Sequence, residues 1–255
     1  MKIHKLDGYI QTIYLIEEDE GLLLLDGASR ADIALIKNYI TEQLLRSIKD
    51  LKVVVVSHMH PDHAGAADPL RKLSGCLIVG TKRRYHWYRG FLGALMHITD
   101  IFLARWVAKR QGKKRRNLWY SRKLKFDVEL LDNQMLPVFK NWQVVETPGH
   151  TDRDLSIYHQ GIGLIYIGDL LVKVKKGLVP PFPIFYPNRY RASLTKINRL
   201  KPKSLLLAHG GEVKFQELDC STLRENLPTE PKTHWRLLKL KVRQTFTKLL
   251  SFSEC

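Results

Sequence analysis

The amino-acid sequence predicts an α/β fold, and three observations lead to that prediction. Short apolar or alternating runs typical of strands take turns with segments that have helical spacing. The 255 residues are 44% hydrophobic and 26% charged, which is enough for one globular domain with a full core. Histidines and aspartates follow directly after several strands, where an α/β fold places the side chains of a site.

The first third of the chain contains four of the predicted strands and two of the predicted helices. The strands cover residues 10–17, 22–25, 52–56 and 76–79. Apolar residues at positions 33, 36, 40, 44 and 48 have helical spacing and predict a helix over 31–47. A second, shorter helix is predicted over 66–73.

After residue 125 the strand signals resume. Strands are predicted over 126–131, 142–146, 155–159, 164–167 and 204–208, and helices over 189–200 and 216–225. Four of the predicted strands in the whole chain are followed within a few residues by His58, His150, Asp169 or His209. We therefore expect these four side chains to meet at one edge of the fold.

The segment from Ser57 to His63 is a dense group of potential metal ligands. It holds His58, His60, Asp62 and His63, and imidazole and carboxylate groups bind Zn²⁺, Mn²⁺ and iron. His58 and His60 are two residues apart, so they project to the same side of an extended segment. Because the four ligands cannot easily reach one tetrahedral ion, two adjacent ions are expected.

Three further ligands are predicted downstream. His150 lies in a Pro-Gly turn, Asp169 follows Gly168, and His209 stands before two glycines that permit close approach of the backbone. The ordered motifs HxHxDH, PGHT, GD and a final His before Gly resemble the metallo-β-lactamase superfamily over about residues 10–215. The resemblance implies a four-layer αβ/βα sandwich with the metals at one edge.

The resemblance also implies a role for each residue. The first ion would be bound by three histidines, His58, His60 and His150. The second ion would be bound by Asp62, His63 and His209, and Asp169 would bridge the two. Asp26 would hold the HxHxDH loop, since a ligating imidazole needs a partner for its other nitrogen, and Thr151 would help similarly.

The implied activity is that of a hydrolase with two divalent metal ions, zinc being expected and manganese or iron possible. A metal-bound hydroxide would attack the substrate, and Asp62 would orient it or take its proton, which makes Asp62 the expected catalytic residue. The motifs look most like the glyoxalase II and lactonase branch, which indicates an ester, thioester, lactone or lipid-like acyl substrate. Substrate-binding residues are not predicted.

Two alternatives remain open at this point. The first is a phosphodiesterase or nuclease that acts on phospholipid or RNA, because basic and aromatic residues alternate in the chain. The second is a mononuclear iron dioxygenase, which would leave Asp62, His63 and His209 without a metal. Antibiotic hydrolysis is disfavoured, because no cysteine stands at a ligand position.

The net charge of +17 is concentrated in two segments. Residues 82–125 contain fourteen Lys or Arg and the single acid Asp100, and residues 232–248 contain six and no acid. The sequence therefore predicts a catalytic domain over 1–227 with a helical basic-aromatic insert at about 81–125, followed by a basic amphipathic tail over 228–255. Polar residues inside the apolar run 91–108 argue against a transmembrane helix and favour a long amphipathic one.

These charges also lead to expectations about partners and location. We expect a small or lipid-like, anionic substrate and peripheral contact with an acidic membrane surface, with nucleic acid less favoured. The three cysteines, Cys76, Cys220 and Cys255, suggest no disulfide framework, and the N-terminus does not read as a signal peptide. A cytoplasmic protein, peripheral at the membrane, is expected.

Overall fold

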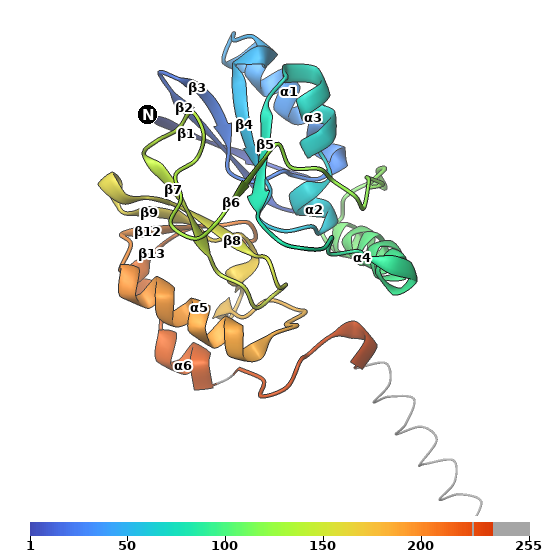
Figure 1. The fold of residues 1–255 in the computed structure, drawn as a ribbon, viewed down its shortest axis with the longest axis vertical. Helices are drawn as coiled ribbons and strands as arrows, with labels where there is room; N and C mark the ends of the chain where they lie inside the picture. Colours follow the sequence, from blue (N-terminus) through green and yellow to red (C-terminus); the bar gives the residue numbers. More distant parts are fainter. Residues whose placement is uncertain (226, 237–255) are drawn as a thin grey trace, which may run out of the picture.

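The fold consists of two packed β-sheets with helices on both outer faces (Figure 1). It is seen in a computed structural model that describes residues 1–225 and 227–236. The first sheet has six strands in sequential order. They are β1 (Lys2–Asp7), β2 (Thr12–Glu18), β3 (Gly21–Leu24), β4 (Leu51–Val55), β5 (Leu77–Thr81) and β6 (Val128–Leu130).

The second sheet has five strands in the order β13-β12-β9-β8-β7. They are β7 (Trp142–Glu146), β8 (Leu155–His159), β9 (Leu164–Tyr166), β12 (Ser204–Leu207) and β13 (Gly211–Lys214). Strands β7 and β9 are both antiparallel to β8, and β12 is parallel to β9. The carboxyl ends of β7, β9 and β12 therefore lie at the same edge of this sheet.

The helices complete the layers. They are α1 (Ile33–Asn38), α2 (Pro61–Ala64), α3 (Ala67–Ser74), α4 (Gly90–Arg110), α5 (Pro187–Leu200) and α6 (Cys220–Glu225). Figure 1 shows α1 and α3 outside the first sheet, and α5 and α6 outside the second. A small hairpin, β10 (Val172–Val174) with β11 (Gly177–Val179), stands apart from both sheets.

Three buried clusters hold the layers together. The middle one joins side chains from both sheets, such as Val53 and Val55 with Trp142 and Tyr166. A second packs the outer face of the first sheet against helices that include α4, and a third packs the second sheet against α5 and α6. Successive strand side chains enter different clusters: Leu22 and Leu24 join the second cluster, and Leu23 and Leu25 join the middle one. Both faces of the strands are therefore buried, which produces the four-layer αβ/βα architecture and confirms the predicted fold class.

The helix predicted over 31–47 is shorter than expected. The α-helix ends at Asn38, a π-helical turn covers Tyr39–Gln43, and Leu45 has a positive φ of 53°. Tyr39, Ile40 and Thr41 have low helix propensity, so the wider turn costs little here. It keeps Ile40 buried and brings the hydroxyl of Tyr39 to 3.0 Å from Nδ1 of His4.

Four strands were not expected from the sequence. They are β1, β10, β11 and β13. In β1 only His4 and Leu6 are buried, so the run looks polar although it alternates. The other three strands have three or four residues each, which is too short for a periodic signal.

Helix α4 confirms the length of the predicted helix but corrects its expected amphipathic character. Its inward face includes the polar His97 and Asp100, and its outward face carries Phe91, Phe102 and other apolar side chains. The reason is that Asp100 contacts the site described below, whereas His97 packs edge-on against the rings of Tyr88 and Tyr120. By length and composition alone α4 could cross a membrane. Of the apolar 18-residue stretch of α4 that meets this criterion, 28% is buried in the structure. That the polar residues of α4 exclude a spanning helix stays a prediction.

The predicted tail falls largely outside the described residues. Residues 228–236 are described, and Lys232 forms an isolated antiparallel bridge with Ile184. The amphipathic pattern expected beyond residue 236 is not covered by the structure. The predicted domain boundaries therefore remain predictions.

Candidate metal centre

The seven predicted ligands come together between the two sheets, at the carboxyl ends of their strands. They form two groups whose potential donor atoms lie within 4.8 Å of one another. The first group is His58, His60, His150 and Asp169, and the second is Asp62, His63 and His209. His58 follows β4, whereas His150, Asp169 and His209 follow β7, β9 and β12.

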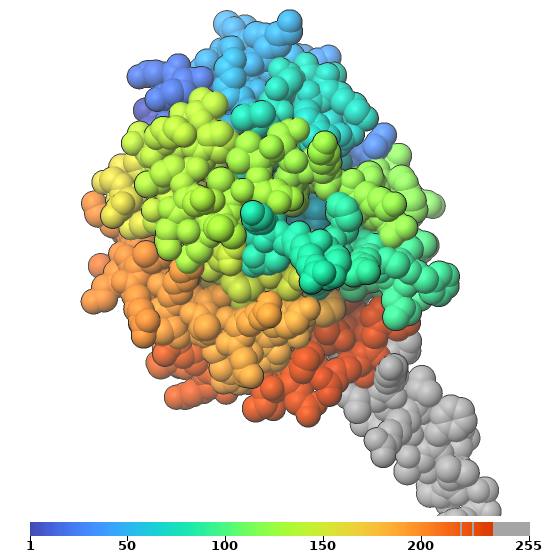
Figure 2. All heavy atoms as spheres, in the orientation of Figure 1, coloured from blue at the N-terminus to red at the C-terminus, as the bar shows by residue number. Residues whose placement is uncertain are grey.

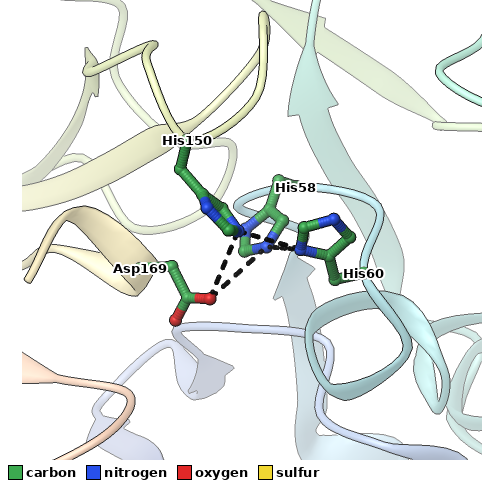
Figure 3. Close-up of side chains that lie close together, drawn as sticks. All are labelled: His58, His60, His150 and Asp169. Carbon is green, nitrogen blue, oxygen red and sulfur yellow. Dashed lines mark hydrogen bonds and ion pairs between the residues drawn. The ribbon is translucent and has the colours of Figure 1, made fainter. Parts of the chain in front are cut away.

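The first group converges on one point (Figure 3). Nδ1 of His60 lies 3.0 Å from Nε2 of His58 and 2.9 Å from Nε2 of His150. Oδ2 of Asp169 lies 3.8 Å from the His58 nitrogen and 3.4 Å from the His150 nitrogen. Three imidazole nitrogens and one carboxylate oxygen thus face a common centre, as tetrahedral coordination requires.

The second group lies on the other side of Asp169. Oδ1 of Asp169 is 3.2 Å from Nε2 of His63 and 3.3 Å from Nε2 of His209. Oδ2 of Asp62 is 3.5 Å from the same nitrogen of His63 and 3.2 Å from that of His209. Since the two oxygens of Asp169 face different groups, this carboxylate occupies the position expected of a bridging ligand.

The nitrogens that point away from the centre are held by protein oxygens. Nδ1 of His63 lies 2.6 Å from the carboxylate of Asp26, and Nδ1 of His58 lies 3.0 Å from Oγ of Ser57. Nδ1 of His150 and Nδ1 of His209 lie 2.6 and 3.1 Å from backbone carbonyl oxygens. Such contacts fix the orientation and tautomer of a ligating imidazole, so these rings are prepared for metal.

Asp26 is the hub of this outer network, in the place that the resemblance implies. Its carboxylate accepts hydrogen bonds from the backbone N–H and the hydroxyl of Ser57, and from the hydroxyl of Tyr166. Together with its contact to His63, these bonds connect β4, the HxHxDH loop and β9. The burial of Asp26 is therefore fully compensated by its partners.

Several inward atoms have no hydrogen-bond partner, and a coordinated cation would satisfy them. Nε2 of His63 and Oδ1 of Asp169 are buried without a hydrogen bond among the described residues. Buried polar atoms without partners are uncommon in folded proteins. The set of nitrogen and carboxylate donors therefore fits divalent metal ions.

The electrostatics differ between the two groups. Burial, with the neighbouring imidazoles, lowers the pKa of His58 well below its usual value and that of His60 to about 3. These two rings are neutral, which is the form that binds a metal. Burial opposes protonation of His63 as well, but Asp169, Asp62 and Asp26 raise its pKa well above the usual value.

Thr151 has a different contact from the one that the resemblance implies. Its hydroxyl and its backbone N–H donate to the carboxylate of Asp154, which also accepts from the N–H of Gly149. Thr151 is fully buried and contacts no ligating imidazole in these bonds. It therefore shapes the turn that carries His150.

The insert supplies one residue that the sequence analysis did not assign to the site. Asp100 of α4 is buried, and its Oδ2 lies 3.7 Å from Nε2 of His60 and accepts a 2.8 Å hydrogen bond from the hydroxyl of Tyr88. Burial raises the pKa of Asp100 to about 7, and the nearby charge of Asp62 adds to the shift. The sequence offered one signal for this role of Asp100, which is the presence of an aspartate within an otherwise apolar run.

A cavity of about 810 Å³ opens over the two groups of ligands. Its floor includes Asp62, Asp169 and His209. Its walls come from α4, from the hairpin and from the segment that follows it, and they also include His234, which the sequence analysis left unassigned. The candidate ligands are thus reachable by a small molecule.

Comparison with known proteins agrees with this geometry. The family model of the metallo-beta-lactamase superfamily matches residues 6–209, so the chain belongs to that superfamily. The chain is also similar to two probable metallo-hydrolases of Bacillus subtilis (strain 168). YqjP is 22% identical over 219 residues, covering 78% of this chain and 66% of YqjP. YflN is 23% identical over 228 residues, covering 82% of this chain and 83% of YflN. About a third of YqjP thus lies outside the match.

Solved structures share the fold. The metallo-beta-lactamase family protein TTHA1429 from Thermus thermophilus has a TM-score of 0.65 at 19% identity, with 88% of this chain and 78% of that chain covered. TTHA1623, solved in a di-iron-bound form, has a TM-score of 0.56 at 21% identity, with 85% and 96% covered. These structures are similar to the chain in fold, and the chain's own His/Asp groups are suited to divalent metals.

Proposed function

We propose that this protein is a binuclear metal-dependent hydrolase, with zinc as the expected metal, that cleaves an ester, thioester, lactone or lipid-like acyl substrate. The observation that carries the proposal is the composition of the cavity. One cavity combines ligands from both candidate metal groups with walls that are mainly apolar. The apolar walls suit the acyl chain of such a substrate, and the candidate metal ligands lie where its carbonyl group would react.

The chemistry of the centre follows from its donors. His58, His60 and His150 would hold one ion and Asp62, His63 and His209 the other, with Asp169 between them. When bound, such ions lower the pKa of a coordinated water and polarise a carbonyl oxygen. No serine or cysteine nucleophile is needed for acyl cleavage at such a centre.

The chain's own groups would orient the reactants. Asp62 lines the cavity, and its carboxylate is 3.2 Å from His209, so it is placed to hold the attacking water and to accept its proton. The apolar walls include Leu103 and Val107 of α4 and Val179 of β11. These side chains would bind the acyl part of the substrate and exclude bulk water from the reaction.

Two lysines at the cavity suit an anionic substrate. Lys113 lies just after α4, Lys173 lies in β10, and both line the cavity. Lys113 also forms an ion pair of 3.3 Å with the exposed Asp7. A carboxylate, or the phosphate of a phospholipid, would be attracted equally, so cleavage of a phosphodiester is the second candidate.

The single-iron dioxygenase is less well supported by the site. In that reaction Asp62, His63 and His209 would have no metal to bind. In the structure these three donors lie together and two of them contact Asp169. Their convergence favours two ions over one.

The test is a substrate panel with the zinc- or manganese-loaded protein. The panel contains short- and long-chain lactones and acyl thioesters, a phospholipid, an aryl phosphodiester and single-stranded RNA. Asp169→Ala removes the carboxylate between the two groups, and Asp50→Ala, in a surface ion pair with Arg46, is the matched control. We expect acyl cleavage that rises with chain length, is retained in Asp50→Ala and is lost by about a hundredfold or more in Asp169→Ala.

Other outcomes of the panel are equally informative. Cleavage confined to phosphodiesters would establish the second candidate and exclude the acyl one. A protein that holds one iron per chain and cleaves no member of the panel would overturn the hydrolase proposal.

A further inference from the structure

Helix α4 carries an exposed apolar stripe along its full length. The stripe consists of Phe91, Leu95, Ile98, Phe102 and Trp106, whose spacings of four, three, four and four residues place them on one helical face. Phe91 is 84% exposed, Phe102 60% and Trp106 54%. A contiguous apolar face of this kind is unusual on a soluble surface and indicates a partner.

The opposite face of α4 is already engaged, so the stripe cannot simply turn inward. His97, Asp100 and Ile101 are buried, and Asp100 is bonded to Tyr88. The close-packed Gly93 has no room for a side chain, because a Cβ there would overlap with the backbone of Tyr88. The helix is therefore fixed against the body, with His97 and Asp100 inside and the apolar stripe outside.

Four cations border the stripe and form its cationic rim: Arg89 just before α4, and Arg105, Lys109 and Arg110 within it. Arg89 stacks on Tyr85 at 4.1 Å and Arg110 on Trp106 at 4.8 Å, measured from the guanidinium carbon to the ring centre. Of the fourteen Lys and Arg between residues 82 and 125, only Arg83 and Lys113 reach a carboxylate within the described part of the chain. The one acid of the segment is buried, so nothing on it neutralises the rim.

The stripe also borders the mouth of the active-site cavity. Trp106 belongs to the stripe and lines the cavity, and its neighbours Leu103 and Val107 line the cavity as well. In Figure 2 the teal and green atoms of the insert form one flank of the molecule, beside the orange and red end of the described chain. A molecule held at the stripe would therefore be close to the candidate metal centre.

We propose that the apolar stripe of α4 and its cationic rim form a docking surface for an anionic phospholipid bilayer, with the cavity mouth turned toward the lipid. Aromatic and aliphatic side chains would enter the boundary between headgroups and acyl chains, and the Lys and Arg of the rim would contact anionic headgroups. Docking goes beyond the proposed reaction and does not depend on it, so the two are measured separately.

Charge favours a bilayer over the other occupants. In a symmetric dimer through the stripe, each basic rim would face its own copy, and like charges would repel. RNA would satisfy the cations but would leave aliphatic side chains such as Leu92, which is 77% exposed, without a matching surface. A bilayer offers negative charge and an apolar layer together.

The experiment is flotation of the full chain with vesicles, either of phosphatidylcholine alone or of phosphatidylcholine mixed with phosphatidylserine. The stripe variant is Phe91→Ser with Phe102→Ser, and neither residue lines the cavity. Its matched control is Leu45→Ser, because Leu45 is also 84% exposed but belongs to another region. The rim variant is Lys109→Glu with Arg110→Glu, and its control is Lys37→Glu with Lys72→Glu.

We expect the protein to float only with the anionic vesicles, and both α4 variants to bind them about tenfold more weakly than their controls. All variants retain the basic C-terminal segment, so the difference isolates α4. The stripe variant is expected to keep its circular dichroism spectrum and its cleavage of a short, water-soluble ester, which separates docking from the reaction.

Three results would overturn the proposal. The first is equal binding of the α4 variants and their controls. The second is equal flotation with both kinds of vesicle. The third is a concentration-dependent dimer that the stripe variant abolishes while vesicle binding is absent, which would assign the stripe to a second copy of the chain.

Discussion

The candidate metal site at the strand ends, called the metal edge here, and helix α4 arrange their polar side chains in opposite ways. At the metal edge, four of the five imidazoles have their outer nitrogen against a protein oxygen. The inward nitrogens and the carboxylate oxygens gather in the two donor groups. Along α4, His97 and Asp100 are buried, whereas Phe91, Phe102 and Trp106 are exposed. The first region suits the binding of divalent ions, and we propose that the second docks on a membrane.

This difference separates what determines chemistry from what determines the substrate. The ligand geometry uses strand ends that belong to the shared fold. Part of the cavity wall and the whole apolar stripe come from α4. Changes at the metal edge should therefore affect every substrate, and changes on the outer face of α4 should affect access.

The largest expected effect is that of Asp26→Ala, which breaks the outer network of the metal edge. Metal affinity should fall by about 10- to 100-fold, because His63 loses the partner that orients it. Stability should fall by about 3 kcal/mol, because the hydroxyls of Ser57 and Tyr166 are left buried without an acceptor. Calorimetric metal titration and urea unfolding measure the two effects.

Asp32→Ala is the matched control for this change. Asp32 is equally buried, and it accepts hydrogen bonds from Ser29 and from the backbone of Tyr9, but it contacts no metal ligand. It should lose stability and keep its metal affinity. Equal metal affinities in the two variants would show that Asp26 does not act through His63.

A somewhat smaller effect is expected from Gly149→Ala, in the turn that carries His150. Gly149 has φ +155°, and a Cβ there would overlap with the backbone and Cβ of Tyr190. The turn and helix α5 would have to separate, so unfolding should become easier by about 2–3 kcal/mol.

Gly75→Ala provides the comparison for this turn. Its φ is +77°, but a Cβ there would meet nothing within 4 Å. Only the backbone strain remains, and about 1 kcal/mol is expected. Thermal denaturation of both variants separates strain from overlap, and equal losses would contradict the packing argument.

The smallest of the three effects belongs to Asp100→Asn, the contact between the two regions. At pH 8, above the raised pKa of Asp100, metal affinity should fall by about tenfold, because the charge 3.7 Å from the outer nitrogen of His60 is removed. Asp127→Asn, which disturbs the ion pair of Arg71 with Asp127, is the control and should bind metal normally. An unchanged metal affinity in Asp100→Asn would show that α4 does not influence metal binding and affects only the entry of substrate into the cavity.

The sequence predicted the metal edge well because its signal is local. HxHxDH places four donors in one loop, and His150, Asp169 and His209 each follow a strand whose apolar run is easily seen. The fold then brings these strand ends together, as the resemblance implied. Apart from Asp26, the partners of the outer nitrogens could not be predicted, since backbone carbonyl oxygens such as that of Pro183 have no sequence signature.

The insert was predicted less completely for a physical reason. Its composition indicated a long helix, but the direction of each face depends on what the helix packs against. An amphipathic helix would turn Asp100 toward solvent, yet its contacts with Tyr88 and His60 make it an inward residue. Periodicity locates the faces of a helix, and only tertiary contacts decide which of them is buried.

The most direct test of the account is to locate and count the metal ions. Crystals of the zinc-loaded protein, measured at the zinc absorption edge, should show two anomalous peaks per chain. One peak should lie among His58, His60 and His150, and the other among Asp62, His63 and His209, with Asp169 between them. A single peak, or a second peak outside this set of residues, would contradict the binuclear centre on which the proposed reaction depends.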